Sequence, residues 1–438
     1  MLPATTMTEA PTRRIKVDAL ARVEGEGALD VSIRDGVVTS VAFRIGEPAR
    51  LFEAFLVGRQ FTEVPDLTAR ICGICPIAYM LSSSQALEHA LDVAVSEPVR
   101  RLRRLIYCGE WIASHVLHAA FLHAPDFLGA ADAFALARRD PALVKTALAL
   151  KGLGNKIMEV AGGRAIHPVN LRLGGFYRAP AADTVRALCG PLREGMAQAM
   201  DLGHAFARFD FPDTEVDYTF VSLHDPAVYA IEQGRIVSNR GLDADVAALR
   251  VHFREEQVKH STALHGLTAA GASYVVGPLA RYANNYPQLT TTARDFAAAL
   301  GLGPVCRNPF KSILVRMVET LFACEEALAL CERYEPPVPA AVPIQPRASE
   351  GHGATEAPRG LCYHHYRMDD GGCITAARIV PPTAQNQRQI EADLAQVIAA
   401  NRDLPADALQ WRCEQAIRNF DPCISCATHF LTVSIRQE

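Results

Sequence analysis

The chain has 438 residues, 49% of them hydrophobic, and a formal net charge of −4. This length and composition allow a large buried core, and the mildly acidic balance argues against a nucleic-acid-binding surface or a polybasic membrane anchor. No uninterrupted apolar run approaches the roughly 20 residues that a membrane helix needs. The 12 cysteines are too few for a disulfide scaffold in a chain of this size. With a start that has no apolar secretory signal, they predict a cytoplasmic protein with reduced thiols.

The N-terminal part of the chain predicts a flexible tail followed by strands. Residues 1–14 are rich in threonine and proline and predict the tail. Residues 15–47 predict strands, with a hairpin turn at Arg34-Asp35-Gly36. Residues 48–64 predict a helix that leads into the first pair of cysteines.

The middle of the chain predicts mostly helices. From Ile77 to about Met200, apolar residues recur largely at helical spacing, with a break at Gly174-Gly175-Phe176. Residues 210–240 are β-like and rich in turns. Residues 250–335 predict a second, largely helical region.

The last hundred residues predict a linker and then mixed structure. Pro336 to Pro346 holds five prolines and predicts an extended linker that carries the chain to Gly351–Gly360. The pattern then predicts a strand at 373–380 and helices at 386–400 and 406–420. We expect residues 15–429 to form one interwoven domain, because its two ends share the motif described next.

Two Cys-x-x-Cys pairs lie near the two ends of the chain. The first pair is Cys72 and Cys75, and the second is Cys423 and Cys426, so that 348 positions separate Cys75 from Cys423. Four thiolates favour zinc, an iron–sulfur cluster or nickel. A structural zinc ribbon usually spaces its pairs by roughly 15–20 residues, which makes structural zinc the weakest interpretation here. The residues themselves leave a dispersed iron–sulfur site open.

The residues around the cysteines resemble those of one family. Five segments, in the right order and spread over nearly the whole chain, are similar to the large, catalytic subunit of the nickel–iron (NiFe) hydrogenases. They are Arg22-Val23-Glu24-Gly25-Glu26-Gly27, Arg70-Ile71-Cys72-Gly73-Ile74-Cys75-Pro76, Gly162-Gly163-Arg164-Ala165-Ile166-His167-Pro168, Glu356-Ala357-Pro358-Arg359-Gly360 and Asp421-Pro422-Cys423-Ile424-Ser425-Cys426-Ala427-Thr428-His429. The two cysteine segments are the most specific.

The resemblance implies a fold and a metal centre. The fold is α+β and mainly helical, with a core of long helices and small peripheral sheets, like that of the NiFe hydrogenase large subunit. Cys72 and Cys423 would bind nickel alone, whereas Cys75 and Cys426 would bridge nickel and iron. The iron would carry CO and cyanide ligands, and H2 would be cleaved heterolytically, or protons reduced, at this centre.

The same resemblance assigns two residues to the reaction. Glu24 would be the first proton carrier, since a buried carboxylate beside a thiolate can relay protons. Glu26 is a competing candidate, and the structural alternative is that Glu24 simply pairs with Arg22. Arg359 would stand over the open face of the metals, hydrogen-bond a cyanide and polarise H2. Its alternative is an ordinary capping or salt-bridge arginine.

Further positions match the surroundings of the family's centre. Pro381, Pro382 and Thr383 resemble the wall around the other cyanide. Glu53 and His429 resemble the ligands of a magnesium ion, completed by a backbone carbonyl near Arg378. A solvated helix face is the alternative for Glu53, and a hydrogen bond alone is the alternative for His429.

Three histidines and two departures from the family pattern complete the picture. His115, His118 and His123 lie on one predicted helix, and we expect them to support the site from behind the ligands. Tyr79 and Ser114 replace a histidine and an aspartate that are common in the family, which puts hydrogen bonding to a bridging thiolate and a proton relay in doubt.

The resemblance also implies partners. This chain has no further cysteine cluster suited to electron transfer and no Gly-x-Gly-x-x-Gly nucleotide signature. We therefore expect an iron–sulfur small subunit and, beyond it, flavin and NAD(P)-binding subunits. A hydrogen-sensing regulatory subunit is the alternative; a metal-free relative in respiratory complex I is disfavoured by the four cysteines. The tail Phe430–Glu438 is either removed during maturation or retained as a strand.

Overall fold

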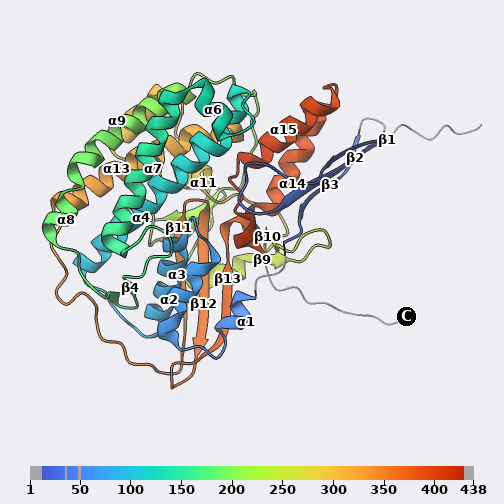
Figure 1. The fold of residues 1–438 in the computed structure, drawn as a ribbon. Helices are drawn as coiled ribbons and strands as arrows, with labels where there is room; N and C mark the ends of the chain where they lie inside the picture. Colours follow the sequence, from blue (N-terminus) through green and yellow to red (C-terminus); the bar gives the residue numbers. More distant parts are fainter. Residues whose placement is uncertain (1–11, 35–36, 48–50, 429–438) are drawn as a thin grey trace, which may run out of the picture.

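The computed structural model describes residues 12–34, 37–47 and 51–428 of the chain (Figure 1). Long helices α4, α7, α9 and α13 pack side by side at one end, and the sheet β11–β12–β13 runs along α3 at the other. Helices α14 and α15 lie beside the N-terminal sheet β1–β2–β3. This mainly helical α+β architecture confirms the predicted fold class.

The helices fall into a long and a short group. Those of nine residues or more are α3 (Pro76–Ala90), α4 (Glu97–Val116), α7 (Pro141–Gly162), α9 (Cys189–Phe206), α12 (Thr291–Ala299), α13 (Ser312–Glu332), α14 (Pro382–Ala400) and α15 (Ala406–Arg418). The shorter ones are α1 (Phe52–Leu56), α2 (Val64–Thr68), α5 (Ala124–Leu128), α6 (Ala133–Arg139), α8 (Ala182–Arg186), α10 (Leu249–His252), α11 (Pro278–Asn285) and α16 (Ile424–Ala427). A π-helical segment, η3 (Leu117–His123), continues α4, and 3-10 turns are η1 (Phe61–Glu63), η2 (Ala69–Ile71), η4 (Val246–Ala248), η5 (Tyr286–Gln288) and η6 (Pro309–Lys311).

The strands form small antiparallel sheets. Their bounds are β1 (Thr12–Val17), β2 (Gly27–Arg34), β3 (Val37–Ile45), β4 (Leu171–Arg172), β5 (Gly175–Phe176), β6 (Val221–His224), β7 (Arg235–Ser238), β8 (Asp243–Ala244), β9 (Phe253–Glu256), β10 (His265–Thr268), β11 (Ser349–Ala357), β12 (Gly360–Met368) and β13 (Ile374–Val380). Within the described residues, three sheets have three strands each and two are two-stranded hairpins.

Local signals explain where the long helices begin and end. In α7 the Asp140 side chain accepts the N–H of Leu143 at 2.9 Å and Pro141 occupies the first turn, both of which favour a helix start. Gly163 follows the last turn with a φ of +84°, the left-handed conformation that often ends helices. Both ends of α7 are therefore marked by local residues of the sequence.

Several predicted elements differ from the structure. Strand β1 begins at Thr12, inside the expected 1–14 tail. The expected helix at 48–64 is divided into the short α1 and the turn η1. The segment Gly351–Gly360, for which the sequence predicted no strand, forms most of β11 and the start of β12. The region at 250–335, which was predicted to be largely helical, also contains the hairpin β9–β10. Its two strands are stabilised by pairing with each other, and no local sequence pattern indicates that pairing.

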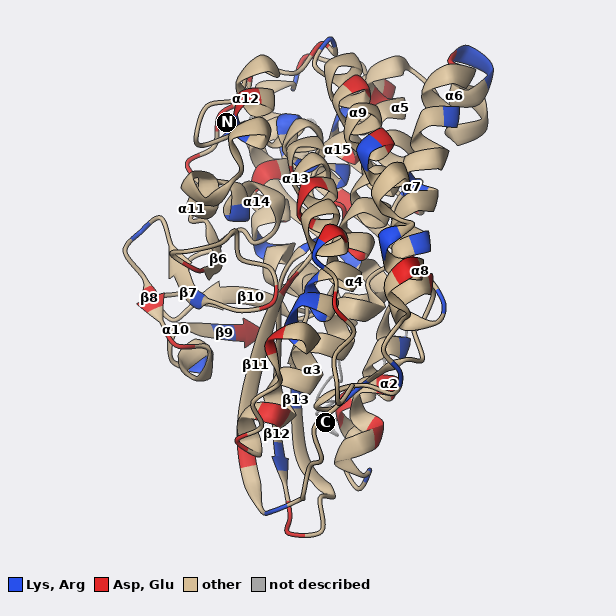
Figure 2. Ribbon diagram, turned by 90° about the vertical axis from the view of Figure 1, so that its left-hand side faces the viewer, with Lys and Arg blue, Asp and Glu red and all other residues tan. Residues whose placement is uncertain are grey.

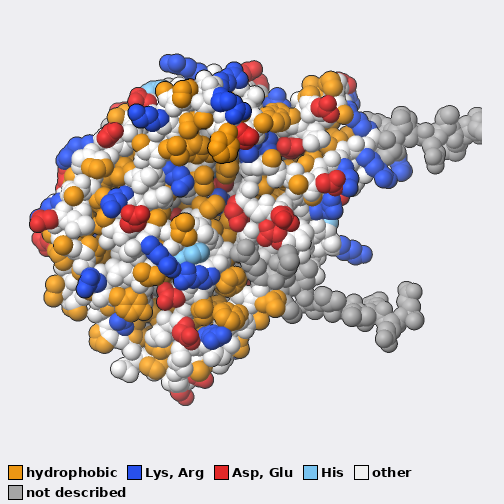
Figure 3. All heavy atoms as spheres, in the orientation of Figure 1, with side chains coloured by type: hydrophobic (Ala, Val, Ile, Leu, Met, Phe, Trp, Pro, Cys, Tyr) orange, Lys and Arg blue, Asp and Glu red, His pale blue; other side chains and the backbone are white. Residues whose placement is uncertain are grey.

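Charged and hydrophobic side chains alternate on the surface. Lys and Arg are interspersed with Asp and Glu along α7, α8, α9 and α13 (Figure 2), and exposed hydrophobic side chains lie between charged ones on the face of Figure 3. One segment, Glu97–Leu128, is long and apolar enough to cross a membrane, but 89% of its most apolar stretch is buried inside the protein. That burial is the environment of a core helix.

Candidate metal centre

The four paired cysteines converge in the interior. Cys72 and Cys75 flank the short loop between η2 and α3, and Cys423 and Cys426 lie at the start of α16 and within it. Sulfur atoms are 2.8 Å apart in the first pair, 2.7 Å in the second and 3.6 Å between Cys72 and Cys423. All four sulfurs lie within 4.8 Å of one another, and all four residues are buried. This arrangement suits four thiolates that share one metal centre.

The first pair is set up to hold negative charge. Two backbone N–H groups, one of them from Cys75, donate to Cys72 Sγ at 3.3 and 3.1 Å. Burial opposes ionisation of Cys72, but hydrogen bonds with the other thiols and the charge of Arg359 outweigh it and hold its pKa well below the ordinary value. Burial and nearby thiols raise the pKa of Cys423 and Cys426 well above it. The thiols therefore ionise as one coupled group, and a bound cation would draw off the remaining protons.

Arg359 lies in the tight turn between β11 and β12, beside the second cysteine pair. Its Nε donates to the carbonyl oxygen of Asp421 at 2.8 Å, and its Nη2 donates to Asp421 Oδ1 at 3.0 Å. Both side chains are buried, and among the described residues Arg359 Nη1 and Asp421 Oδ2 have no hydrogen-bond partner. Arg359 therefore forms a salt bridge with Asp421, and its Nη1 amino group remains available to a further hydrogen-bond acceptor. Sequence reasoning quoted Asp421 within its motif without assigning it this role.

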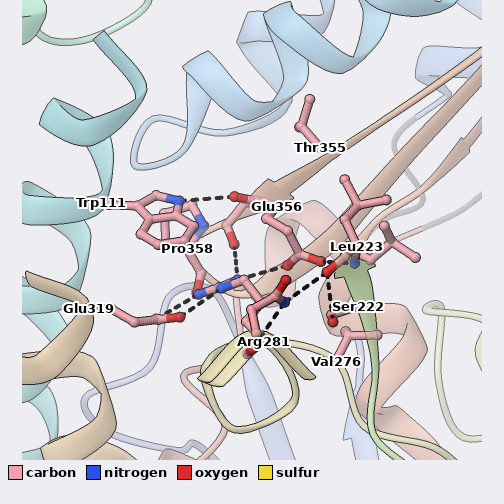
Figure 4. A network of polar contacts seen from close by, with 12 residues as sticks. Trp111, Ser222, Leu223, Val276, Arg281, Glu319, Thr355, Glu356 and Pro358 are labelled. Atoms are coloured by element: carbon pink, nitrogen blue, oxygen red, sulfur yellow. Dashed lines mark hydrogen bonds and ion pairs between the residues drawn. The ribbon is translucent and has the colours of Figure 1, made fainter. Parts of the chain in front are cut away.

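A second buried arginine holds the turn in place (Figure 4). Arg281, on α11, donates from Nη1 to the carbonyl of Ala357 at 2.6 Å and from Nη2 to the carbonyl of Pro358 at 2.9 Å. It also forms ion pairs with Glu319 of α13 at 2.9 Å and with Glu356 of β11 at 3.0 Å. All three charged side chains are 0% exposed. The network fixes the two residues that precede the arginine of the turn.

The two carboxylates of this network have opposite pKa shifts. Burial opposes ionisation of Glu319, but Arg281 and then His115 outweigh it and lower its pKa to about 2. In Glu356, burial outweighs Arg281 and raises the pKa to about 7. The N–H of Leu223 donates to Glu356 Oε1 at 2.7 Å. Near neutral pH, the Arg281 cation therefore pairs with a fully ionised Glu319 and a partly protonated Glu356.

Glu24 contacts the second cysteine pair. Its main chain forms a parallel bridge with Cys423. The Cys423 thiol donates to Glu24 Oε2 at 3.0 Å, and the N–H of Ser425 donates to the same oxygen at 3.2 Å. Arg22 pairs with an aspartate of α5 instead of with Glu24. Glu26, the competing candidate, is exposed.

Gly25 makes this close approach feasible. Its φ is +87°, and a Cβ atom there would lie 2.5 Å from Glu47 Oε1, 2.8 Å from Ser425 Oγ and 2.9 Å from the Cβ of Ile424. Ser425 Oγ donates to Glu47 Oε1 at 3.0 Å, and that oxygen also accepts the N–H of Glu26 at 2.6 Å. Glu47 thus joins the Ser425 hydroxyl to the main chain at Glu26.

Thr383 lies against the second cysteine pair from another side. It is buried in the first turn of α14, which Pro381 precedes and Pro382 begins. Its Oγ1 accepts the N–H of Cys423 at 3.0 Å. The hydroxyl hydrogen remains available as a donor, which is the property that the prediction for Pro381 and Thr383 required.

Of the two predicted magnesium ligands, Glu53 lies within the described residues and His429 does not. Glu53, on α1, lies against β13, where its Oε1 accepts the N–H of Ile379 at 2.7 Å and its Oε2 is 3.6 Å from Arg378 Nη1. These contacts exclude a plain solvated helix face for Glu53. Arg378 also pairs with Glu255. His429 lies outside the described residues, so the magnesium site stays a prediction.

The three histidines of the α4–η3 region have separate partners. His115 Nε2 is 3.0 Å from a glutamate of α13, His118 Nε2 contacts the carbonyl of Arg418 at 2.7 Å, and His123 Nε2 contacts Asn419 Oδ1 at 2.9 Å. Burial lowers the pKa of His115 to about 4 and that of His123 to about 3, so both are neutral near pH 7. Two of them therefore hold the segment that leads into the second cysteine pair.

Other buried groups surround the first pair. Tyr79 lies one turn beyond Cys75 on α3, and burial followed by the charge of Cys426 raises its pKa well above the ordinary value. Its hydroxyl and that of Ser114 have no hydrogen-bond partner in the described part of the chain. Sequence reasoning missed Glu110, which accepts the N–H groups of the second and third residues of α3 at 2.6 and 3.1 Å. No local signal marks Glu110, because it lies more than 30 positions further along the chain.

Comparison with known proteins agrees with this geometry. Residues 50–149 and 268–429 match the family model described as nickel-dependent hydrogenase. Sulfhydrogenase 2 subunit alpha of Pyrococcus furiosus is 33% identical over 425 residues, covering 95% of this chain and 99% of that protein. The NAD-reducing hydrogenase HoxS subunit beta of Cupriavidus necator is 28% identical over 96% of this chain and 95% of its own length. The crystal structure of an NAD+-reducing nickel–iron hydrogenase in the H2-reduced state superposes with a TM-score of 0.88 at 27% identity, over 96% of this chain and 100% of that one. Similarity over this length, with the cysteines in place, shows that the chain belongs to the nickel-dependent hydrogenase family and is the large subunit of an oxidoreductase that acts on hydrogen.

Proposed function

We propose that this chain cleaves H2 heterolytically, and forms it in reverse, at a nickel–iron centre held by its two cysteine pairs. The observation that carries the proposal is the convergence of four buried thiols from both ends of the chain. Cys72 and Cys423 would hold nickel alone, and Cys75 and Cys426 would bridge nickel and iron. When bound, such a centre supplies soft, redox-active metals that take electrons from H2.

The residues around the thiols fit a centre whose iron carries CO and cyanide. Arg359 Nη1 is buried and lacks a partner among the described residues, and a guanidinium N–H left unpaired in the interior is costly. The Thr383 hydroxyl offers a second donor. Both are groups that would hydrogen-bond cyanide nitrogen atoms and orient the centre.

Glu24 would carry the proton away from the centre. Its Oε2 is 3.0 Å from Cys423 Sγ, within reach for direct transfer from the thiol. The carboxylate of Glu24 would hold the proton. Glu47, which accepts a hydrogen bond from the Ser425 hydroxyl at 3.0 Å, is the next carboxylate on this side of the centre.

Electrons must leave through a partner, because the described residues contain only one group of converging cysteines. We propose an iron–sulfur small subunit that docks beside the first pair, with flavin and NAD(P)-binding subunits beyond it. In the lower part of Figures 1 and 3, α1, α2 and β4 lie together and hydrophobic side chains are exposed. The exposed hydrophobic residues of this region are Leu51, Phe55, Val57, Ile166, Val169 and Tyr177. The large subunits named above come from multi-subunit hydrogenases, which supports this assignment.

Two finer points belong to the same proposal. We place a magnesium ion at Glu53 and His429, supported by the position of Glu53 against β13. We also place the enzyme in the cytoplasm, in line with its resemblance to NAD+-reducing relatives. Magnesium content that is equal in the wild type and in Glu53→Gln would contradict the first point.

Infrared spectroscopy of the purified complex, with nickel and iron quantified in the same sample, tests the proposal. We expect bands from metal-bound CO and cyanide, with one nickel and one iron per chain, followed by H2-dependent reduction of NAD+ or NADP+. Zinc alone, with no such bands in a matured sample, would refute the metal centre. Bands without appreciable turnover would favour the hydrogen-sensing alternative. Mass spectrometry of the active protein would show whether Phe430–Glu438 is retained.

A further inference from the structure

A second group of metal-ligating side chains lies between the β9–β10 hairpin and α14. His260 precedes β10, His265 is in β10 and Glu391 is on α14, about 12 Å along the helix from Thr383. One donor atom from each of the three lies within 4.8 Å of the others. His260 Nε2 is 2.7 Å from Glu391 Oε1, and His265 Nδ1 is 3.9 Å from Glu391 Oε2. Two imidazoles and a carboxylate are a ligand set that zinc and related divalent metals take in proteins.

The strongest sign of a missing ligand is His265. Its side chain is 1% exposed, and neither ring nitrogen has a hydrogen-bond partner in residues 12–34, 37–47 and 51–428. Buried polar groups are almost always paired, so an imidazole with two unpaired nitrogens calls for an explanation. A neutral imidazole ring has a lone pair to offer to a metal ion.

An ion would replace the hydrogen bond between His260 Nε2 and Glu391 Oε1 and would fill the wider gap beside His265. Tetrahedral zinc with bonds of about 2.1 Å holds its nitrogen and oxygen ligands about 3.4 Å apart. The two distances found here, 2.7 and 3.9 Å, lie on either side of that value. A small movement of His260 away from Glu391 and of His265 toward it would bring all three groups to the coordination distance.

Two neighbouring groups also contact the carboxylate. The N–H of Phe43, on β3, donates to Glu391 Oε1 at 3.1 Å. Arg388 Nη1 is 3.7 Å from Glu391 Oε2, on a side chain that is 58% exposed. The uncharged N–H of Phe43 orients the carboxylate of Glu391. The positive charge of Arg388 would compete with a bound metal ion for the same carboxylate. The arginine can withdraw into solvent, so it would weaken metal binding without preventing it.

We propose that His260, His265 and Glu391 bind one divalent transition-metal ion, with zinc as the best match. Water would complete the coordination from the side of the half-buried His260 and from the cavity of about 490 Å³ that Glu391 helps to line. The ion would join the β9–β10 segment to α14. In that segment Ala263 pairs with Thr428, two residues after Cys426. The site would thus anchor the strand partner of the chain end that carries Cys426.

The test is zinc binding to the complete, nickel–iron-loaded complex after weakly bound metals have been removed by dialysis against a chelator. Because the cysteine centre is already filled, added Zn2+ reports on other sites. We expect one zinc per chain to bind in the wild type, and Glu391→Gln and His265→Ala to weaken binding at least about tenfold. Arg388→Gln should tighten it by about fivefold, since a cation 3.7 Å from the carboxylate is removed.

Control variants distinguish zinc bound at this site from zinc bound by other histidines. His365→Ala alters a second histidine–glutamate group, Glu350, His352 and His365, and should leave the tight zinc unchanged. Co2+ bound in place of zinc should give visible d–d bands that lack thiolate charge transfer and that disappear in Glu391→Gln. If the wild type binds no zinc, or if Glu391→Gln and Arg388→Gln bind it as tightly as the wild type, the proposal is wrong. The gain expected in Arg388→Gln cannot arise from misfolding.

Discussion

Replacing Arg281 with methionine would remove the cation that two buried carboxylates share. Glu319 and Glu356 are 0% exposed and lie 2.9 and 3.0 Å from the guanidinium. The methionine side chain fills most of the volume but donates no hydrogen bond. It leaves the carbonyls of Ala357 and Pro358 without the donors that they have in the native protein.

The expected cost is large because a charge in the interior loses its partner. Breaking a buried ion pair from one side costs about 3–5 kcal/mol. Unfolding entropy scales with length, and for 438 residues it corresponds to about 0.9 kcal/mol per degree. We therefore expect Arg281→Met to lower the Tm of the subunit by about 3–6 °C. Because Arg359 follows directly after the freed carbonyls, we also expect the infrared bands of the metal centre to shift.

The pH dependence of this loss has a definite sign. In the native protein Arg281 holds the pKa of Glu319 at about 2, below the ordinary 4.5, so Glu319 contributes stability that is present above about pH 4.5 and lost as the pH falls toward 2. Without Arg281, burial raises that pKa, and the folded variant holds a proton that the unfolded chain has released. The variant then loses about 1.4 kcal/mol of stability per pH unit relative to wild type. The gap in Tm should be wider at pH 8 than at pH 6.

Thermal unfolding at the two pH values, followed by circular dichroism, measures both effects. Arg235→Met is a matched control, because Arg235 forms an exposed pair with Asp243 that is worth about 0–1 kcal/mol. The double variant Arg281→Met/Glu319→Gln should recover part of the loss, since one unpaired carboxylate is gone. A Tm change no larger than in Arg235→Met, or a gap that narrows toward pH 8, would refute this account of the network.

Three further changes probe the centre itself. Glu24→Gln should keep nickel, iron and the infrared bands while H2 uptake falls by about 10²–10⁴-fold, since the proton carrier is lost; unchanged uptake would exclude Glu24 from this role. Gly25→Ala should lower nickel incorporation and H2 uptake, because the added Cβ overlaps Glu47 and Ser425, whereas Gly190→Ala, with open space around it, should leave both unchanged. Thr383→Val should cost about 1–3 kcal/mol by leaving the Cys423 N–H unpaired and should shift a cyanide band; Thr383→Ser should restore both, and a normal spectrum in the valine variant would contradict the predicted contact.

The cysteine centre was predictable from sequence because each Cys-x-x-Cys pair is a local motif. The positions of Glu24, Thr383 and Arg359 near the thiols also followed from the resemblance of short segments. What the motifs could not supply were partners far away in the chain. Arg281 lies 38 positions before Glu319 and 75 before Glu356, in segments that no local pattern connects.

Strand β11 shows why part of the fold escaped prediction. Gly351 and Gly353 belong to a stretch that has the composition of a loop, yet both lie in a strand packed against α3. A Cβ atom at Gly351 would lie 2.1 Å from the carbonyl oxygen of Ala86, and one at Gly353 would lie 2.4 Å from that of Ser82. The glycines are needed for the close approach of strand to helix, not for flexibility. A glycine of a flexible loop and a glycine of a strand packed against a helix look the same in the local sequence. Only the position of α3, which depends on distant residues, distinguishes them.

The separation of the two cysteine pairs also sets an order of events during synthesis. Cys72 and Cys423 are 351 positions apart, so at about 5–20 residues per second the first pair waits roughly 17–70 s for the second to be made. Until then the nascent chain holds only one of the two Cys-x-x-Cys pairs, which cannot provide the set of four converging sulfurs. A prematurely terminated chain can never assemble it. The four-sulfur set is therefore complete only after translation has passed Cys426.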